Sequence, residues 1–192
     1  MGLKSTVAAV GLCFSAFTLP VFSADYVIDT KGAHASIEFK VSHLGYSWLK
    51  GRFNNFSGTF SYDEASPEQA VVAVSIDVTS LDSNHAERDK HLRGDDFLDV
   101  KKYPEASFKS TGFQISDSGE GTLSGMFTLK GVTKPLDITV TKIGEGEDPW
   151  GGYRAGFSGV TAFKLKDFGI DYNLGPASET VYLELEIEGV RE

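Results

Sequence analysis

Apolar and polar residues alternate along most of the chain with a period of two. Successive side chains of a β-strand point to opposite faces, so this period predicts strands with one dry face and one wet face. The clearest alternation lies at residues 35–42, 56–62, 72–78, 136–141 and 181–188. Weaker runs that contain glycine lie at 108–116, 122–130 and 154–166. Short, turn-rich connections separate several of these runs, so we expect about eight antiparallel strands joined mostly by hairpins.

One-sided strands of this kind must share one interior. A closed barrel removes the exposed edges of a sheet, whereas a sandwich removes them only in part. Gly58, Gly125 and Gly159 stand inside predicted strands, where glycine suits the sharp bends of a closing barrel. The pattern therefore favours an all-β fold, a single antiparallel β-barrel of about eight strands, over a sandwich. A barrel of this size is either packed solid or holds one small ligand, and the pattern does not choose between the two.

One polar stretch interrupts the strands, with the sequence NHAERDKHLRGDDF at residues 84–97. Asn84 and Glu87 have the spacing of a capping box and Gly94 follows as a stop, so a short helix is predicted at 84–94. His85 and His91 lie on different faces of that helix and lack the H-E-x-x-H spacing, so no metal site is predicted. A structural helix is the favoured interpretation, ahead of a lid over a binding site, and catalysis is the least favoured.

The first residues have the layout of a secretory signal peptide. Lys4 precedes an uncharged apolar run, and a proline and small residues follow that run. Cleavage is expected after Ser23, with cleavage after Ala24 as a near alternative and a retained membrane anchor as the less favoured interpretation. Residues 1–23 are therefore the predicted signal peptide, and residues 24–192 form a single domain that is expected to be exported.

Removal of the leader changes the chemistry that the chain can offer. Cys13 is the only cysteine and leaves with it, so the mature domain has no disulfide, thiolate ligand or cysteine nucleophile. Loss of Lys4 takes the formal net charge from −9 to −10. A chain this acidic argues against nucleic acid and against an anionic membrane surface as partners. A G-x-S-x-G elbow is missing from the sequence as well, which argues against a hydrolase. A non-enzymatic protein is expected, and an enzyme acting on an apolar substrate is the least favoured interpretation.

Seven stretches of the sequence together resemble the YceI-like family of periplasmic proteins. They are ADYVID at 24–29, HLGYSWLKGRF at 43–53, NHAERDKHLRGDDF at 84–97, KYPEASFKST at 102–111, LKGVTKP at 129–135, DPWGGYRAGF at 148–157 and LKDFGIDYNLGPAS at 165–178. The resemblance covers essentially the whole mature chain. It implies a lipocalin-like antiparallel barrel, and some members carry a polyisoprenoid or isoprenoid-quinone chain in the lumen. A non-catalytic carrier of such an apolar ligand, without a cofactor, is therefore expected.

Large apolar side chains on the dry strand faces are the predicted lining of the lumen. The predicted lumen residues are Phe39, Phe60, Val74, Ile76, Phe127, Phe157, Phe163, Leu183 and Leu185. A ligand gains roughly 0.3 kcal/mol per heavy atom, so a chain of tens of carbons would gain about 10 kcal/mol without any strong polar contact. A packed core would use the same residues equally well. A ligand-free structural or stress-related protein with a filled barrel is therefore the alternative function.

Two aromatic stretches form the predicted mouth of such a pocket. The predicted mouth residues are Tyr46 and Trp48 in LGYSWLKG, and Trp150, Tyr153 and Arg154 in EDPWGGYR. Aromatic side chains with a polar group suit the wet rim of an apolar cavity. A plug that closes the barrel is an equally favoured interpretation of each stretch. The sequence leaves self-association as a homodimer open.

Overall fold

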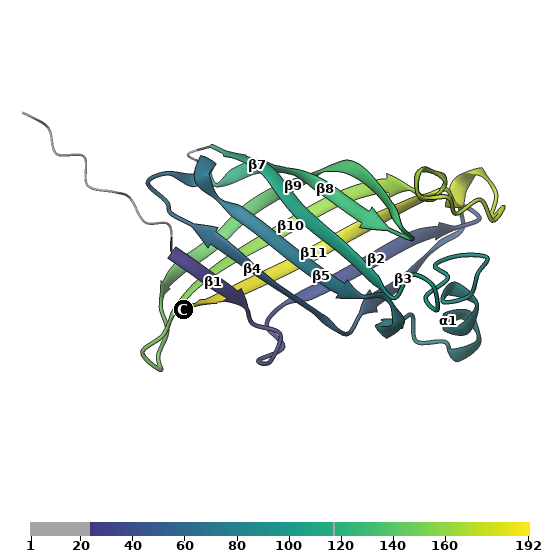
Figure 1. Ribbon diagram of the computed structural model, residues 1–192, viewed down its shortest axis with the longest axis horizontal. Coiled ribbons are helices and arrows are strands. Elements are labelled where there is room, and N and C mark those ends of the chain that lie inside the picture. The colour runs from purple at the N-terminus through teal and green to yellow at the C-terminus, as the bar shows by residue number, and fades with distance from the viewer. Residues whose placement is uncertain (1–23, 117) are drawn as a thin grey trace, which may run out of the picture.

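The computed structural model describes residues 24–116 and 118–192 (Figure 1). The predicted signal peptide at 1–23, including Lys4 and Cys13, lies outside the described residues. No helix in the described part of the chain is long and apolar enough to cross a membrane.

Eleven strands in the described residues form one antiparallel sheet. The strands are β1 (Ala24–Ile28), β2 (Ser36–His43), β3 (Ser47–Phe53), β4 (Phe56–Tyr62), β5 (Val71–Asp77), β6 (Leu81–Asp82), β7 (Glu105–Ile115), β8 (Glu120–Leu129), β9 (Val132–Glu147), β10 (Tyr153–Lys164) and β11 (Thr180–Arg191). The same residues contain one α-helix and four 3-10 turns. These are α1 (Ala86–Leu92), η1 (Pro67–Gln69), η2 (Val78–Ser80), η3 (Leu165–Phe168) and η4 (Pro176–Ser178).

The sheet closes on itself to form a barrel. β1 pairs with β4 on one side and with β11 on the other, and the ring runs from β4 through β5, β7, β8, β9 and β10 to β11. This ring of eight antiparallel strands, with one short helix, confirms the predicted fold class. Closure gives each edge strand a partner and so removes the edges to which other chains could add.

Three of the eight positions in the barrel consist of two strands placed end to end. β11 pairs with β1 at residues 189–191 and with β2 at residues 181–186. In the same way β3 and β4 occupy one position, and β5 and β6 the next. These strands end where side chains form hydrogen bonds with the backbone. The Asp77 carboxylate accepts a hydrogen bond from the Thr79 N–H at 2.9 Å, and the Ser80 hydroxyl accepts one from the Asn55 N–H at 2.9 Å. Such local bonds compete with the hydrogen-bond ladder of a sheet.

Two inward glycines make room for aromatic rings. A Cβ on Gly125 would lie 2.3 Å from the Phe108 ring, and a Cβ on Gly51 would lie 2.3 Å from the Phe39 ring. Any larger residue at either position would overlap a ring in the close-packed interior. The sequence predicts a bend at Gly125, and the structure adds this packing reason for glycine there.

The segment between β6 and β7 covers one end of the barrel. β6 pairs with β3, and β7 pairs with β5 and β8, so residues 83–104 leave the barrel wall. This segment, which contains α1, is called the α1 cover, and the end that it occupies is called the α1 end. The α1 end lies opposite the chain's C-terminus (Figure 1).

Helix α1 starts later than the sequence predicts. Its N-cap is His85, whose Nδ1 accepts a hydrogen bond from the Arg88 backbone N–H at 3.2 Å. Asn84 instead has a φ of +60°, a left-handed conformation that asparagine tolerates better than most residues. The predicted capping box of Asn84 and Glu87 is therefore wrong. The shift places Arg88, whose side chain has no acceptor atom, where the box needs a glutamate or glutamine.

Candidate functional site

The barrel interior contains two apolar cavities, each with a volume of about 120 Å³. Cavity 1 lies between β4, β5, β7, β8, β9, β10 and β11, and cavity 2 lies at the α1 end. Ile76 lines both cavities, so they are neighbours along the barrel. The side chains of the barrel therefore leave space inside it that is lined almost wholly by carbon.

All nine predicted lumen residues lie on the walls of these cavities. Cavity 1 is lined by Phe60, Val74, Phe157 and Leu185, cavity 2 by Phe39, Phe127, Phe163 and Leu183, and both by Ile76. These residues come from six different strands, and on each strand the period of two identified the inward face. That a ligand contacts these residues stays a prediction.

Aromatic rings pack against one another in both walls. In cavity 1 the Phe157 ring meets Phe60 and Tyr62 edge-on, with ring centroids 5.7 and 5.1 Å apart. In cavity 2 the centroids of Phe127 and Phe163 are 5.5 Å apart. Tilted and edge-on pairs of this kind are favourable arrangements of aromatic rings. Phe157 and Phe163 are half-buried, so they are less tightly enclosed than the buried rings of Phe60 and Phe127.

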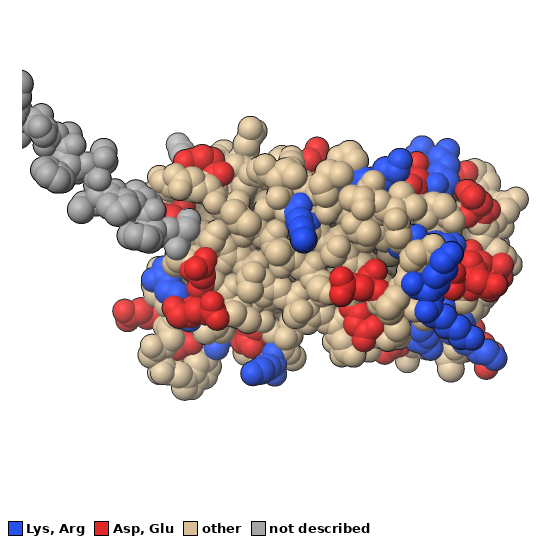
Figure 2. All heavy atoms as spheres, in the orientation of Figure 1, with Lys and Arg blue, Asp and Glu red and all other residues tan. Residues whose placement is uncertain are grey.

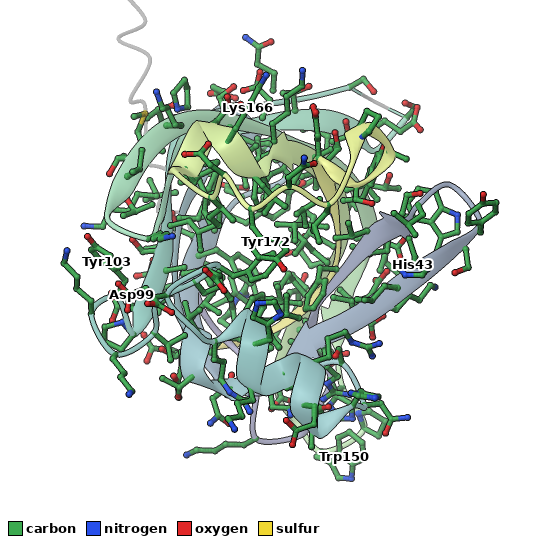
Figure 3. All side chains as sticks on the ribbon, turned by 90° about the vertical axis from the view of Figure 1, so that its right-hand side faces the viewer. His43, Asp99, Tyr103, Trp150, Lys166 and Tyr172 are labelled. Carbon is green, nitrogen blue, oxygen red and sulfur yellow. The ribbon has the colours of Figure 1, made fainter. Side chains whose placement is uncertain are left out.

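Two segments cover cavity 2 at the α1 end. One is the α1 cover, and the other is residues 165–178, here called the second cover. Their wall residues are Leu92, Phe97 and Leu98 from the α1 cover and Leu165, Ile170 and Leu174 from the second cover. The Tyr172 ring joins the covers, with its centroid 5.2 Å from that of His91 and 4.8 Å from that of Phe97. Tyr172 lies over the middle of the barrel end in Figure 3.

The period of two does not identify these six cover residues as wall residues. They lie in segments without alternation, where a period of two gives no information about which side chains point inward. The available signal is isolated large apolar residues in polar surroundings, such as Leu92 and Phe97 within residues 84–97. That stretch forms a helix and also part of a cavity wall, so the interpretations as structural helix and as lid describe the same segment.

The predicted mouth residues do not line either apolar cavity in the described structure. Trp48 points away from the lumen, since its neighbour Leu49 faces cavity 2, and its ring packs edge-on against Tyr182 at 5.5 Å. Tyr46 lies at the turn between β2 and β3, with 89% of its surface exposed. The prediction of these residues as a rim is corrected, because an aromatic residue next to a turn can point inward or outward and the sequence does not say which.

The other mouth residues lie at the opposite end of the barrel. Trp150, in the turn between β9 and β10, is 81% exposed. Arg154 pairs with the C-terminal part of β11, whereas the β2–β3 hairpin pairs with its N-terminal part. At about 3.3 Å per residue along a strand, these positions are roughly 30 Å apart. The two predicted halves of one mouth therefore belong to different ends.

A polar pocket of about 260 Å³ borders cavity 2. It shares Leu165, Ile170 and Leu174 with cavity 2, and its remaining walls include Lys166 and Glu179. The three shared side chains separate an apolar space from a polar one. The second cover thus offers apolar contact on its inner side and hydrogen-bonding groups on its outer side.

A charged cluster surrounds Arg154 at the end opposite α1. The Arg154 guanidinium donates to Asp29 at 2.8 Å, to Asp148 at 2.8 Å and to Glu188 at 2.5 Å. The hydrogen bond from Arg154 is the main cause that lowers the pKa of Asp29 to about 2.

Within the described residues, Asp29, His34 and Glu188 present ligand atoms within 4.8 Å of one another. Three such atoms could in principle hold a metal ion. However, the Arg154 cation bonds two of the three side chains and would repel a second cation. The cluster is therefore best described as an ion-pair network that ties the β1–β2 loop to β10 and β11.

Comparison with known proteins places this fold in a family. The YceI-like domain matches residues 26–189. The UPF0312 protein of Shewanella putrefaciens is 59% identical over 170 residues, which cover 88% of this chain and 89% of that one. The UPF0312 protein of Shewanella sp. strain MR-7 is 56% identical over 189 residues, which cover 98% and 99% of the two chains.

Solved structures agree with this assignment. The Campylobacter jejuni YCEI protein superimposes with a TM-score of 0.72 and 30% identity, covering 80% of this chain and 91% of that one. Burkholderia cenocepacia BcnA superimposes with a TM-score of 0.74 and 22% identity, covering 84% and 98%, which shows the same fold. The molecule is thus a closed antiparallel barrel of the lipocalin-like kind. The chain belongs to the YceI-like family.

Proposed function

We propose that the protein is a periplasmic, non-catalytic carrier that holds an apolar isoprenoid in its barrel. The observation that carries this proposal is the pair of neighbouring apolar cavities, whose walls offer an apolar guest contact with carbon on almost every side. A polyisoprenoid binding domain from Saccharophagus degradans has a similar fold, with a TM-score of 0.63 and 15% identity over 89% of this chain and all of that one. Its name supports the class of ligand, and the apolar walls support it independently.

The cavity volumes determine how much ligand fits without rearrangement. An engineered apolar cavity of about 150 Å³ holds one benzene molecule. Each cavity of about 120 Å³ therefore accepts at most a group the size of one isoprene unit. A longer chain requires the walls to move. The half-buried rings of Phe157 and Phe163 and the two covers, which lie outside the barrel wall, are the parts that we expect to move.

The same volumes favour a second candidate function. If the covers stay closed, the barrel is nearly filled by its own side chains and acts as a ligand-free structural or stress-related protein. The two candidates differ in a measurable way. A carrier purified from its own host brings a lipid with it, and a filled barrel does not.

Native mass spectrometry combined with solvent extraction tests the carrier. We expect an isoprenoid mass in wild-type protein, and a lower lipid content in Val74→Phe, because the added ring occupies cavity 1. The free energy of unfolding should stay unchanged or rise, since the ring fills existing space. A ligand-free barrel with closed covers contains the same cavity 1, so the lipid content, and not the free energy of unfolding, separates the two candidates.

Val160→Phe is the matched control for this experiment. Val160 lies on β10 and is exposed, so the same change of residue leaves the lumen untouched. It should alter neither lipid content nor stability. A clean ligand-free mass for wild-type protein would contradict the carrier and leave the filled barrel.

The periplasmic location is tested separately. Intact-mass measurement of protein from the native host should place the mature N-terminus at Ala24, or at Asp25. A retained leader would contradict both the location and the argument from the loss of Cys13.

A further inference from the structure

The turn between β2 and β3 and the start of β3 expose three large apolar side chains close together. Leu44 is 56% exposed, Tyr46 is 89% exposed and Trp48 is 54% exposed. His43 marks this hairpin in Figure 3, where it projects away from the barrel. Single exposed apolar residues are common, but three within five positions at a protruding tip form a patch.

The backbone of the same turn is unfavourable for leucine. Leu44 has a φ of +54° and Gly45 a φ of +81°, and the Tyr46 N–H donates to the His43 carbonyl at 3.0 Å. Positive φ at both central residues is typical of a hairpin turn that prefers Asn-Gly or Asp-Gly. A leucine in this conformation is strained, and strain of this kind points to a functional reason for the residue.

The hairpin tip touches the segment that covers cavity 2. The Ser178 hydroxyl donates to the Ser42 carbonyl at 2.6 Å, and it accepts from the Leu44 N–H at 3.4 Å. Val41 and Leu49, on the same hairpin, line cavity 2. One hairpin therefore carries the cavity wall on its inner face and the exposed apolar patch at its tip, next to the second cover.

We propose that this tip, Leu44, Tyr46 and Trp48, inserts into the surface of a phospholipid bilayer. The proposal extends the proposed function, because an apolar ligand stored in a bilayer would then reach the second cover without crossing water. Tryptophan and tyrosine are the residues that favour the membrane interface. A convex tip also suits a deformable lipid surface better than a protein partner, which would need about 800 Å² of matching surface on each side.

The charges around the tip fit insertion rather than electrostatic adsorption. Lys40 and Lys50 face each other across the hairpin, with the Lys40 ammonium 5.7 Å from the Trp48 ring. Lys40 also pairs with the Glu184 carboxylate, so Lys50 is the lysine of this pair that can extend to the phosphate level while its stem stays in contact with apolar groups. At the α1 end in Figure 2 acidic side chains lie among the basic ones, so this face is not a purely basic surface. The chain as a whole is acidic, so a zwitterionic bilayer is the expected surface.

The two tryptophans of the chain stand at opposite ends of the barrel, which provides a direct test. Trp150→Phe leaves Trp48 as the only tryptophan, and Trp48→Phe leaves Trp150. Titration with phosphatidylethanolamine and phosphatidylcholine vesicles should shift the emission of the Trp150→Phe protein to the blue. The emission of the Trp48→Phe protein should not shift. An unshifted Trp48, or an equal shift at both ends, would overturn the proposal.

Leu44→Asn separates loss of binding from loss of folding. Asparagine suits the turn, so this variant should melt a few degrees higher, about 2 °C or more, while its vesicle affinity falls about tenfold. Binding that survives Leu44→Asn and Tyr46→Ser together would contradict the role of the tip. Lipid content measured on the same samples keeps the two proposals apart. If the protein carries a co-purified lipid but does not bind vesicles, only the membrane contact is refuted. If it binds vesicles but carries no co-purified lipid, only the carrier function is refuted.

Discussion

Replacement of Asp89 by alanine should loosen the α1 cover and lower the stability of the whole protein. Asp89 is buried, and its carboxylate accepts from the Ser83 N–H at 3.0 Å and from the Ser83 hydroxyl. Ser83 is buried too, and Arg88 holds it from the other side, with Nε 2.7 Å from its hydroxyl. These bonds fix the start of α1 against the chain that leaves β6.

The magnitude follows from the two hydrogen bonds that end on a charged acceptor. Each is worth about 1.5–3 kcal/mol, and the two are not additive because both join Ser83 to the same Asp89 oxygen. We therefore expect Asp89→Ala to lower the free energy of unfolding by about 3 kcal/mol. For a domain of this size that corresponds to a fall in Tm of roughly 6–12 °C. Asp89→Asn retains an acceptor without the charge and should lose about half as much.

Thermal melts followed by circular dichroism measure this effect. Glu87→Ala is the matched control, since it removes an exposed carboxylate from the same helix and should change stability by no more than about 0.5 kcal/mol. Hydrogen exchange should show faster opening of residues 83–93 in Asp89→Ala. A Tm within about 2 °C of wild type would refute the argument that this network holds the cover.

Three further predictions concern other parts of the barrel. The pKa of Asp29 is about 2 in the folded protein, below its ordinary value of 3.8, so its ion pair should stabilise the protein above about pH 4 and be lost as the pH falls toward 2. Urea melts should show that the free energy of unfolding depends less on acid pH in Asp29→Asn than in wild type. An unchanged pH dependence would contradict the role of Arg154. Phe127→Asp should prevent folding whether or not a ligand binds, because the apolar wall of cavity 2 offers the carboxylate no partner. If circular dichroism shows that this variant folds, water must reach this wall. Asn84→Ala should lower the free energy of unfolding by about 1 kcal/mol, because alanine is unfavourable in the left-handed backbone conformation, and Asn84→Gly should lower it much less. Equal losses of stability in chemical denaturation would instead indicate a role of the asparagine side chain.

The barrel and its lining were predictable because a single physical rule decides both. On a strand the side chains alternate, so runs such as residues 181–188 reveal their inward positions without any knowledge of their neighbours. The closure of the sheet into a barrel was predictable because it gives both edge strands of the sheet a hydrogen-bonding partner. The nine predicted lumen residues therefore lie on the cavity walls, although nothing in an alternating pattern says whether the walls enclose empty space.

The covers and the helix start depend on contacts that a pattern does not encode. Asp77 and Ser80 interrupt strands through bonds to distant or adjacent backbone, and Ser83 and Asp89 fix α1 through a buried pair. The N-cap moved from Asn84 to His85 because Asn84 takes the left-handed turn that brings the chain into the helix. Each of these outcomes was one of several that the local sequence allows, and long-range packing selected it.

The arrangement of β11 has a consequence for how the molecule is made. β11 pairs with β10 on one side and with both β1 and β2 on the other, and Arg191 Nη2 donates to the Tyr26 hydroxyl at 3.1 Å across 165 positions of sequence. Contacts between residues so far apart close long loops and form late. The first strands to be synthesised, β1 and β2, therefore complete their pairing only after β11, the last strand, has been made. A nascent chain that stops short of residue 180 leaves β1, β2 and β10 with open edges at once, and these edges find their partner only when β11 has been synthesised.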